Sequence, residues 1–432
     1  MGLLDAPLTP RTLTRSQRYT ETLRASGLVP VGTRPRAFAD TLQRLSDGTE
    51  TGKMYRTSDA LAVDLQSPRL VYVNRYFSST TFLEAAGPNR IFVRAAVIGP
   101  TVSGGLGNGI FRATFGGSDV GVIEPGEQLV TDPIPDLTLL AGQQFWAHTW
   151  VYVATLGEKW PVSVPGIDTS LNEGYANTDL TGTNTGWTSS NLSYGYCPAS
   201  IVGPSTAPTV AAIGDSIANG YADTPNYKGF IARALNGNFG WCSVANDGDT
   251  VQRASSPTTT RLRDKVLYGA KYAIVHYGRN DLSNGRTAAQ IESDLITRCR
   301  MLVTQGITPF VCTVPPRTSS TDNWQTTVNQ TKHSSETARV ALNQWIRAGM
   351  PIDATTKAPV AVGTGGAKVA GDAGHPVKGV FDTCSAVETA QDSGYWKLNA
   401  GAASAWYTTD GIHPLAAGYA AMAAIVDTVL FT

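Results

Sequence analysis

The stretch TVAAIGDS, residues 209–216, constrains the fold of this chain more than any other. Its apolar run predicts a buried strand, and Gly214 marks the end of that strand. In open α/β sheets, the residues that follow a strand lie at the carboxyl edge, where ligands bind. The stretch therefore predicts that Ser216 is presented at the functional edge of a sheet, in a suitable place for a nucleophile.

Strand and helix patterns alternate from this stretch to the C-terminus. Apolar runs predict further strands over residues 241–246, 270–278 and 308–314. Helical spacing predicts helices over residues 227–236, 287–302, 334–349 and 414–430, the second of them opened by a capping box of Thr287 and Gln290. We therefore expect residues 205–432 to form a flavodoxin-like three-layer α/β/α parallel sheet. A Gly-rich segment, about residues 354–406, interrupts the alternation and is expected to lie over the site as an insertion.

The preceding residues, 66–204, carry strand patterns of a different kind. The apolar runs are short, rich in β-branched and aromatic residues and separated by Gly, Pro, Asn and Asp, as in residues 69–77, 89–99, 109–117 and 143–155. This spacing predicts an all-β sandwich or jelly-roll accessory domain. Residues 170–197 are polar and predict a long loop, and residues 203–208 mark the boundary with the next domain.

The strand predicted over residues 143–155 has two contrasting faces. A period of two places Trp146, His148, Trp150 and Tyr152 together on one of them. If exposed, this aromatic face would suit stacking on a sugar. The alternative is that these rings fill the sandwich or the seam between the domains, as large aromatic side chains usually do.

Residues 1–65 are Arg-rich and only patchily apolar. We interpret them as an arm or docking segment, which would place the protein in an oligomer or a larger assembly; the alternative is that they pack on the next domain. Residues 34–48 could form one short amphipathic helix ending at Gly48. No signal-peptide pattern is visible at the N-terminus, so we expect a cytoplasmic or virion-associated protein, or one exported by another route.

Charge and cysteine usage exclude several classes of protein. Lys and Arg together number 34, as do Asp and Glu, so no net charge draws the chain to nucleic acid or to an anionic membrane. No apolar run reaches the length of a membrane span. The five cysteines lack metal-site spacing, and no HExxH motif is present, so we expect neither a metal nor another cofactor.

Four short motifs in the second half contain the residue types needed for serine-dependent ester hydrolysis. GDSI supplies Ser216, NDGDT supplies Gly248, YGRND supplies Asn280, and DGIHP supplies Asp410 and His413. A serine nucleophile needs a base, for which His413 is the candidate, and a group that orients the base, here Asp410. The backbone N–H groups of Ser216 and Gly248 and the side-chain amide of Asn280 would donate to the oxyanion.

Each of these residues also has a structural interpretation. Ser216 could cap a helix. Asp410 and His413 could open the last helix with Pro414 in its first turn, Asn280 could lie in a turn, and Gly248 could be an ordinary loop glycine.

In order and context, the four motifs resemble those of the SGNH hydrolases, also called GDSL esterases. The resemblance covers residues 205–432 and implies the roles given above, with an acyl-enzyme intermediate and without a cofactor. A looser resemblance covers residues 113–151, which are similar to the β-sandwich segment that precedes the catalytic domain in some bacterial SGNH esterases. It implies an accessory domain beside the site, with carbohydrate as a candidate ligand.

Three further residues lie near these motifs or in the Gly-rich segment. Arg279, next to Asn280, would favour an acidic substrate such as a uronate or a sialate; the alternative is an outward salt bridge. His375 could contact the substrate. His276, at the end of a strand pattern, is expected to be a core histidine.

The leading hypothesis is therefore a serine ester hydrolase that removes short acyl groups from a glycan, most plausibly a carbohydrate O-acetylesterase. Its substrate would be an acylated glycan or a small ester. One alternative is a surface or virion-associated carbohydrate-binding or structural protein that carries an esterase domain. Another is a lipase or short-chain carboxylesterase, although the chain lacks the GxSxG motif of the α/β-hydrolases.

Overall fold

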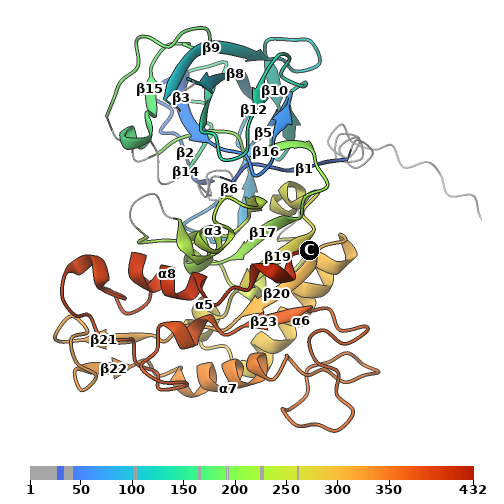
Figure 1. Cartoon of the computed structure of the whole chain (residues 1–432), viewed down its shortest axis with the longest axis vertical. Coiled ribbons are helices and arrows are strands. Elements are labelled where there is room, and N and C mark those ends of the chain that lie inside the picture. The colour runs from blue at the N-terminus through green and yellow to red at the C-terminus, as the bar shows by residue number, and fades with distance from the viewer. Residues whose placement is uncertain are drawn as a thin grey trace, which may run out of the picture.

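The computed structural model of the protein describes residues 27–33, 42–101, 103, 105–163, 167–190, 192, 194–223, 228–259 and 262–432. Within these ranges an antiparallel β-rich region precedes an α/β region built on a parallel sheet (Figure 1).

Five parallel strands make the central sheet of the α/β region. In spatial order they are β18 (Gly240–Ser243), β17 (Thr209–Gly214), β19 (Tyr272–His276), β20 (Thr308–Cys312) and β23 (Gly379–Phe381). The first two strands in the chain are exchanged in space, as in flavodoxin-like doubly wound sheets, whose ligand site lies at the carboxyl edge beside the first strand. The predicted fold class is confirmed.

Strand β23 corrects the expectation that residues 354–406 are an insertion over the site. It pairs in parallel with β20, with Val380 opposite Val311, and so forms the edge of the central sheet. The strand has only three residues within a Gly-rich sequence, which is too short for a recognisable apolar pattern.

Helices cover both faces of the central sheet. One face carries α6 (Ala288–Thr304) and α7 (Glu336–Arg347), and the other carries α3 (Gly229–Leu235) and α8 (Ala416–Ala423). The prediction for residues 414–430 was too long, because α8 ends at Ala423. Shorter helices are α2 (Ser216–Asn219), α4 (Val251–Ala254), α5 (Arg279–Ser283), and the 3₁₀ turns η1 (Thr169–Leu171), η2 (Arg263–Leu267), η3 (Thr383–Ala386), η4 (Ala403–Ala405) and η5 (Thr428–Leu430).

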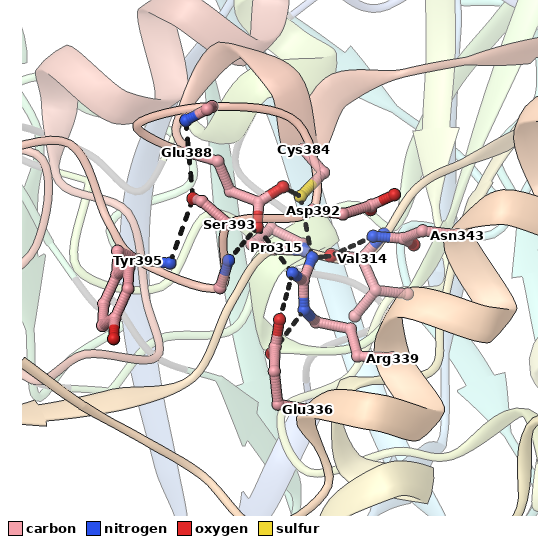
Figure 2. Close-up of polar contacts among 12 residues, drawn as sticks. Val314, Pro315, Glu336, Arg339, Asn343, Cys384, Glu388, Asp392, Ser393 and Tyr395 are labelled. Atoms are coloured by element: carbon pink, nitrogen blue, oxygen red, sulfur yellow. Dashed lines mark hydrogen bonds and ion pairs between the residues drawn. The ribbon is translucent and has the colours of Figure 1, made fainter.

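A buried ionic network fixes the segment after β23 to α7 (Figure 2). The guanidinium of Arg339, which has no exposed surface, donates to Glu336 at 2.6 Å and to Glu388 at 2.5 Å. The Cys384 thiol lies 2.8 Å from the second oxygen of Glu388, and its burial raises its pKa well above the usual value. Each charge in this network has a partner, so we assign it a structural role.

Two antiparallel sheets and three strand pairs build the β-rich region. The first sheet contains β1 (Leu28–Pro30), β16 (Ser200–Pro204), β5 (Arg69–Val73) and β11 (Gln128–Val130). The second contains β10 (Gly121–Ile123), β8 (Ile91–Pro100), β13 (Phe145–Tyr152), β3 (Gly52–Asp59) and β15 (Gly174–Ala176), with β9 (Leu106–Ala113) paired to β8. The pairs are β2 (Leu42–Leu45) with β14 (Pro161–Ser163), β4 (Leu65–Gln66) with β12 (Thr138–Leu139), and β6 (Arg75–Phe77) with β7 (Glu84–Ala86). The predicted strands are present, while the jelly-roll connectivity stays a prediction.

Part of the predicted N-terminal arm belongs to the β-rich region. Strands β1 and β3 are members of the two sheets, which favours the alternative that this segment packs on the domain that follows. The helix expected over residues 34–48 is wrong at residues 42–45, which form β2. Residues 1–26 and 34–41 lie outside the described residues, so a docking role for them stays a prediction.

The aromatic face of β13 is covered at its centre. Trp146 and His148 have no exposed surface. The indole N–H of Trp146 donates to the carbonyl of Leu171 at 2.8 Å, and the His148 ring lies 4.5 Å from the Trp187 ring. The segment expected to be a loop over residues 170–197, which also contains β15, therefore packs over this face. At Trp146 and His148, the side chains therefore fill the interior of the β-rich region, as the alternative interpretation predicted.

Candidate active site

Ser216 follows β17, which lies between β18 and β19 in the sheet, through a tight connection. A Cβ at Gly214 would collide with the carbonyl of His276 and the side chain of Ala218, so only glycine fits at the end of β17. Asp215 then caps α2 by accepting from the N–H of Ile217 at 3.0 Å. Ser216 is the first residue of α2 rather than its cap, which removes the structural interpretation of this serine.

Ser216, His413 and Asp410 form a continuous chain of hydrogen bonds. The Oγ of Ser216 lies 2.8 Å from Nε2 of His413, and Nδ1 of His413 lies 2.6 Å from Oδ2 of Asp410. The side chain of Ser216 is nearly buried, whereas those of His413 and Asp410 keep 16% and 44% of their surface exposed. The cluster is therefore ordered by hydrogen bonds while remaining open to a ligand.

The carboxylate of Asp410 is held in its ionised form. Partial burial alone would raise its pKa, but hydrogen bonds from the His413 ring and from the backbone N–H groups of His413 and Ile412 lower the pKa to about 2. Helix α8 begins at Ala416, with Leu415 as its cap residue, so Asp410 and His413 do not open that helix.

Gly411 positions this loop, and sequence reasoning did not single it out. It has φ +71°, and a Cβ there would collide with the carbonyl of Thr318. Its carbonyl accepts from the N–H of Thr318 at 3.1 Å and from the indole of Trp396 at 3.0 Å. The glycine in DGIHP was the available signal for this constraint.

The two other motif residues lie on neighbouring segments at the same sheet edge. Gly248 follows β18 and has φ +78°, and Asn280 lies in α5 directly after β19. The side-chain amide of Asn280 donates to the carbonyl of Asp249 at 2.9 Å, so it faces the Gly248 loop. This loop also connects to the helix of the serine, because Asn219 donates to Asp247 at 2.8 Å. Asn280 is thus helical and not part of a turn.

Two buried acids lie beneath this edge. Asp281 accepts from the N–H groups of Val251 and Gln252, and its pKa is raised to about 6 because burial outweighs these hydrogen bonds. Asp215 lies 3.5 Å from the ring of His276, which is fully buried as expected.

Both predictions for Arg279, contact with an acidic substrate and an outward salt bridge, are wrong. Its side chain is 2% exposed and donates to the hydroxyl of Ser335 at 2.9 Å, so it neither faces a substrate nor forms an outward salt bridge. Burial, together with the charges of Arg317 and Arg339, lowers its pKa to about 10. Arg279 therefore fixes α5 to the residues before α7.

His375 is also misplaced by the sequence prediction. It comes before β23, and its Nε2 lies 2.9 Å from the carbonyl of Met350. Because β23 runs parallel to β17, residues before β23 lie at the amino edge of the sheet, opposite Ser216. His375 therefore cannot contact a substrate bound at Ser216.

The described ranges contain neither a candidate metal site nor a membrane-spanning helix. Within them, no group of three or more His, Cys, Asp or Glu residues is arranged to hold a metal ion. The same part of the chain contains no helix long and apolar enough to cross a membrane.

Comparison with known proteins places the α/β region in a family. Residues 212–421 match the model of the GDSL-like Lipase/Acylhydrolase family. These residues therefore form a GDSL-type acylhydrolase domain, and the matched family supports ester hydrolysis by a serine enzyme as its general activity. A comparison with curated proteins gave no match.

Several solved structures are similar to this chain at low identity. A GDSL-like lipase from Bacteroides thetaiotaomicron is 14% identical, with 51% of this chain and 87% of that chain covered and a TM-score of 0.32. A lipase/acylhydrolase from Enterococcus faecalis is 17% identical, with coverages of 50% and 92% and a TM-score of 0.32. The salicylyl-acyltransferase SsfX3 from a tetracycline biosynthetic pathway is 13% identical, with coverages of 88% and 81% and a TM-score of 0.30.

Proposed function

We propose that this protein, whose residues 212–421 form a GDSL-type acylhydrolase domain, uses Ser216 to remove short acyl groups, acetyl above all, from hydroxyls of a glycan. The observation that carries the proposal is the hydrogen-bond chain from Ser216 through His413 to Asp410, with atom separations of 2.8 and 2.6 Å. These are the contacts that serine activation by a neighbouring base requires.

In the first half of the reaction, Oγ of Ser216 attacks the ester carbonyl carbon and its proton passes to Nε2 of His413. Asp410, whose low pKa keeps it ionised at neutral pH, accepts from Nδ1 and stabilises the imidazolium. The carbonyl oxygen, now negative, accepts from the backbone N–H groups of Ser216 and Gly248 and from the amide of Asn280.

The tetrahedral intermediate then collapses. The bond between carbon and the alcohol oxygen breaks, and His413 gives its proton to that oxygen, which leaves an acyl group on Ser216. In the second half, His413 removes a proton from water, the hydroxide attacks the acyl carbon, and the carboxylic acid departs as Ser216 regains its proton.

The groups around His413 support a sugar as the leaving alcohol. The alcohol oxygen must lie beside His413 to receive its proton, and the Tyr221 ring, 40% exposed, lies 4.6 Å from the His413 ring. An exposed aromatic face with a polar tip suits packing on a sugar ring. The loop of Gly248 is also polar, since Asp247 accepts from Asn219 and Arg253 donates to the carbonyl of Gly248. These groups favour a hydroxylated substrate over a long lipid chain.

The test is acetate release from p-nitrophenyl acetate and from a panel of acetylated polysaccharides. We expect Ser216→Ala to abolish turnover on all of them, with an unchanged melting temperature. Ser319→Ala, an exposed serine in β21 (Thr318–Ser320), is the matched control and should behave as the wild type. Equal activity in wild type and Ser216→Ala would overturn the serine mechanism.

Substitutions of Tyr221 test separately whether the substrate is a glycan. Tyr221→Ala should lower kcat/KM about tenfold on acetylated polysaccharide but leave p-nitrophenyl acetate hydrolysis nearly unchanged, and Tyr221→Phe should keep most of the activity because it keeps the ring. The same loss on both substrates, or no activity on any polysaccharide, would contradict a glycan substrate.

A further inference from the structure

A hairpin of the β-rich region reaches the candidate site. Strands β6 and β7 pair antiparallel, with Phe77 opposite Glu84, and the connection between them is residues 78–83. The N–H of Ser78 donates to the carbonyl of Leu83, and the Ser78 hydroxyl accepts from the N–H groups of Thr80 and Thr81. Figure 1 shows β6 extending from the β-rich region toward the α/β region.

Phe82, in this connection, lies directly on Gly248. A Cβ at Gly248 would overlap the Phe82 ring, coming within 2.6 Å of its Cδ1. The guanidinium of Arg253 lies 5.3 Å from the centre of the same ring and donates to the carbonyl of Gly248 at 3.1 Å. The ring therefore contacts the residue whose N–H is proposed to hold the substrate's carbonyl oxygen.

The conformation of Phe82 adds a second observation. Its φ is +53°, a value that bulky residues rarely adopt, and its side chain is only half-buried. Burial of the ring therefore does not explain by itself why the strained backbone is kept. Strained non-glycine residues concentrate at ligand sites.

Charge-assisted hydrogen bonds hold the hairpin in place. The carboxylate of Glu84 accepts from the N–H of Leu262 at 2.8 Å and from the N–H of Arg263 at 2.9 Å. Arg75, 4% exposed, donates to the carbonyl of Arg263 at 3.4 Å. Both strands of the hairpin are thus tied to the α/β region, so the position of Phe82 relative to Gly248 is fixed by the fold.

We infer that Phe82 is a specificity-determining residue that limits the size of the acyl group, an inference that rests on the proposed function. The carbonyl oxygen of the substrate must lie at Gly248, and the leaving alcohol must lie beside His413. The acyl chain therefore extends from the carbonyl carbon past the Gly248 loop, where the Phe82 ring restricts the space. The β-rich region then completes the acyl site and selects short acyl groups.

The experiment compares p-nitrophenyl esters of acetate, butyrate, hexanoate and octanoate with the full-length protein. We expect Phe82→Ala to raise the ratio of kcat/KM for hexanoate to that for acetate at least about tenfold, since single methylene groups in such sites change specificity by this order. Phe82→Leu should give an intermediate ratio. Thr81→Ala, which alters an exposed side chain of the same connection, should keep the wild-type ratio.

Each alternative gives a different pattern. If Phe82 only packs between the regions, Phe82→Ala will lower kcat on all esters by one factor and leave the ratio unchanged, which overturns the inference while the serine mechanism stands. Should the wild type hydrolyse no ester, the same ratio is measured from the labelling rates of Ser216 by alkylphosphonates of matching chain lengths. Neither turnover nor labelling in the wild type would overturn the proposed function and, with it, the inference.

Discussion

Two polar clusters in the α/β region are each built around a hydrogen-bonded carboxylate, but they differ in exposure. In the cluster of Ser216, His413 and Asp410, the carboxylate keeps 44% of its surface exposed and the imidazole 16%. In the cluster around Arg339 and Glu388, neither side chain has exposed surface.

The difference in exposure supports the chemical role proposed for the first cluster and the structural role assigned to the second. The buried cluster pairs every charge with an opposite charge or a hydrogen-bond donor, so no group is available to a ligand (Figure 2). In the open cluster, hydrogen bonds connect the carboxylate of Asp410 through His413 to the hydroxyl of Ser216. This hydroxyl lies at the carboxyl edge of the sheet, where a substrate can approach. We therefore expect changes in the open cluster to affect rate and changes in the buried cluster to affect stability.

His413→Ala gives the largest expected effect, because it removes the proposed base. We predict a loss of kcat of about 10⁴-fold on p-nitrophenyl acetate, with the free energy of unfolding changed by about 1 kcal/mol or less. The matched control is His375→Ala at the opposite edge of the sheet, which should leave kcat unchanged. Equal losses of kcat in the two variants would contradict the assignment of the site to the carboxyl edge of the sheet.

Arg339→Met should have the converse effect. It leaves the buried carboxylate of Glu388 without its ionic partner, so we expect a loss of about 3–5 kcal/mol in the free energy of unfolding, measured by urea denaturation. The kcat of the folded fraction should stay near that of the wild type. As a control, Arg90→Met breaks an exposed pair with Glu124 and should cost under about 1 kcal/mol. A large fall in kcat for Arg339→Met without a loss of stability would contradict the structural role.

The smallest expected effect is the change with pH in the contribution of Asp410 to the free energy of unfolding. Its pKa is lower in the folded protein, about 2, than its usual value of 3.8, so its contribution to stability is present above pH 4 and is lost as the pH falls toward 2. Because the side chain is nearly half exposed, we expect only about 1 kcal/mol. Urea denaturation between pH 5 and 2 should show this loss in the wild type but not in Asp410→Asn. If the free energy of unfolding falls with pH in the same way in both proteins, this would argue against a strong hydrogen bond between Asp410 and His413.

The parts of the fold that depend on local pattern could be predicted from the sequence. The strand ending at Gly214 and the capping box at Thr287 and Gln290 are both present, because each is specified by residues close together in the chain. The placement of Ser216, Gly248 and Asn280 at one edge followed from the geometry of parallel strands.

Features that depend on distant segments could not be predicted. Strand β23 has three residues and takes its place only by pairing with β20. Arg279 is buried where Ser335, from another segment, accepts its hydrogen bond. The contact of Phe82 with Gly248 joins two regions whose sequence patterns are independent, so no periodicity in either region indicates it.

The central claim, that Ser216 is the nucleophile, is tested most directly by covalent labelling. The wild type would be treated with a p-nitrophenyl alkylphosphonate, digested and mapped by mass spectrometry. We predict a single adduct on the peptide that contains Ser216, absent in Ser216→Ala and formed far more slowly in His413→Ala. An unlabelled Ser216 in a preparation that hydrolyses p-nitrophenyl acetate, or an adduct on another residue that blocks this turnover, would contradict the account.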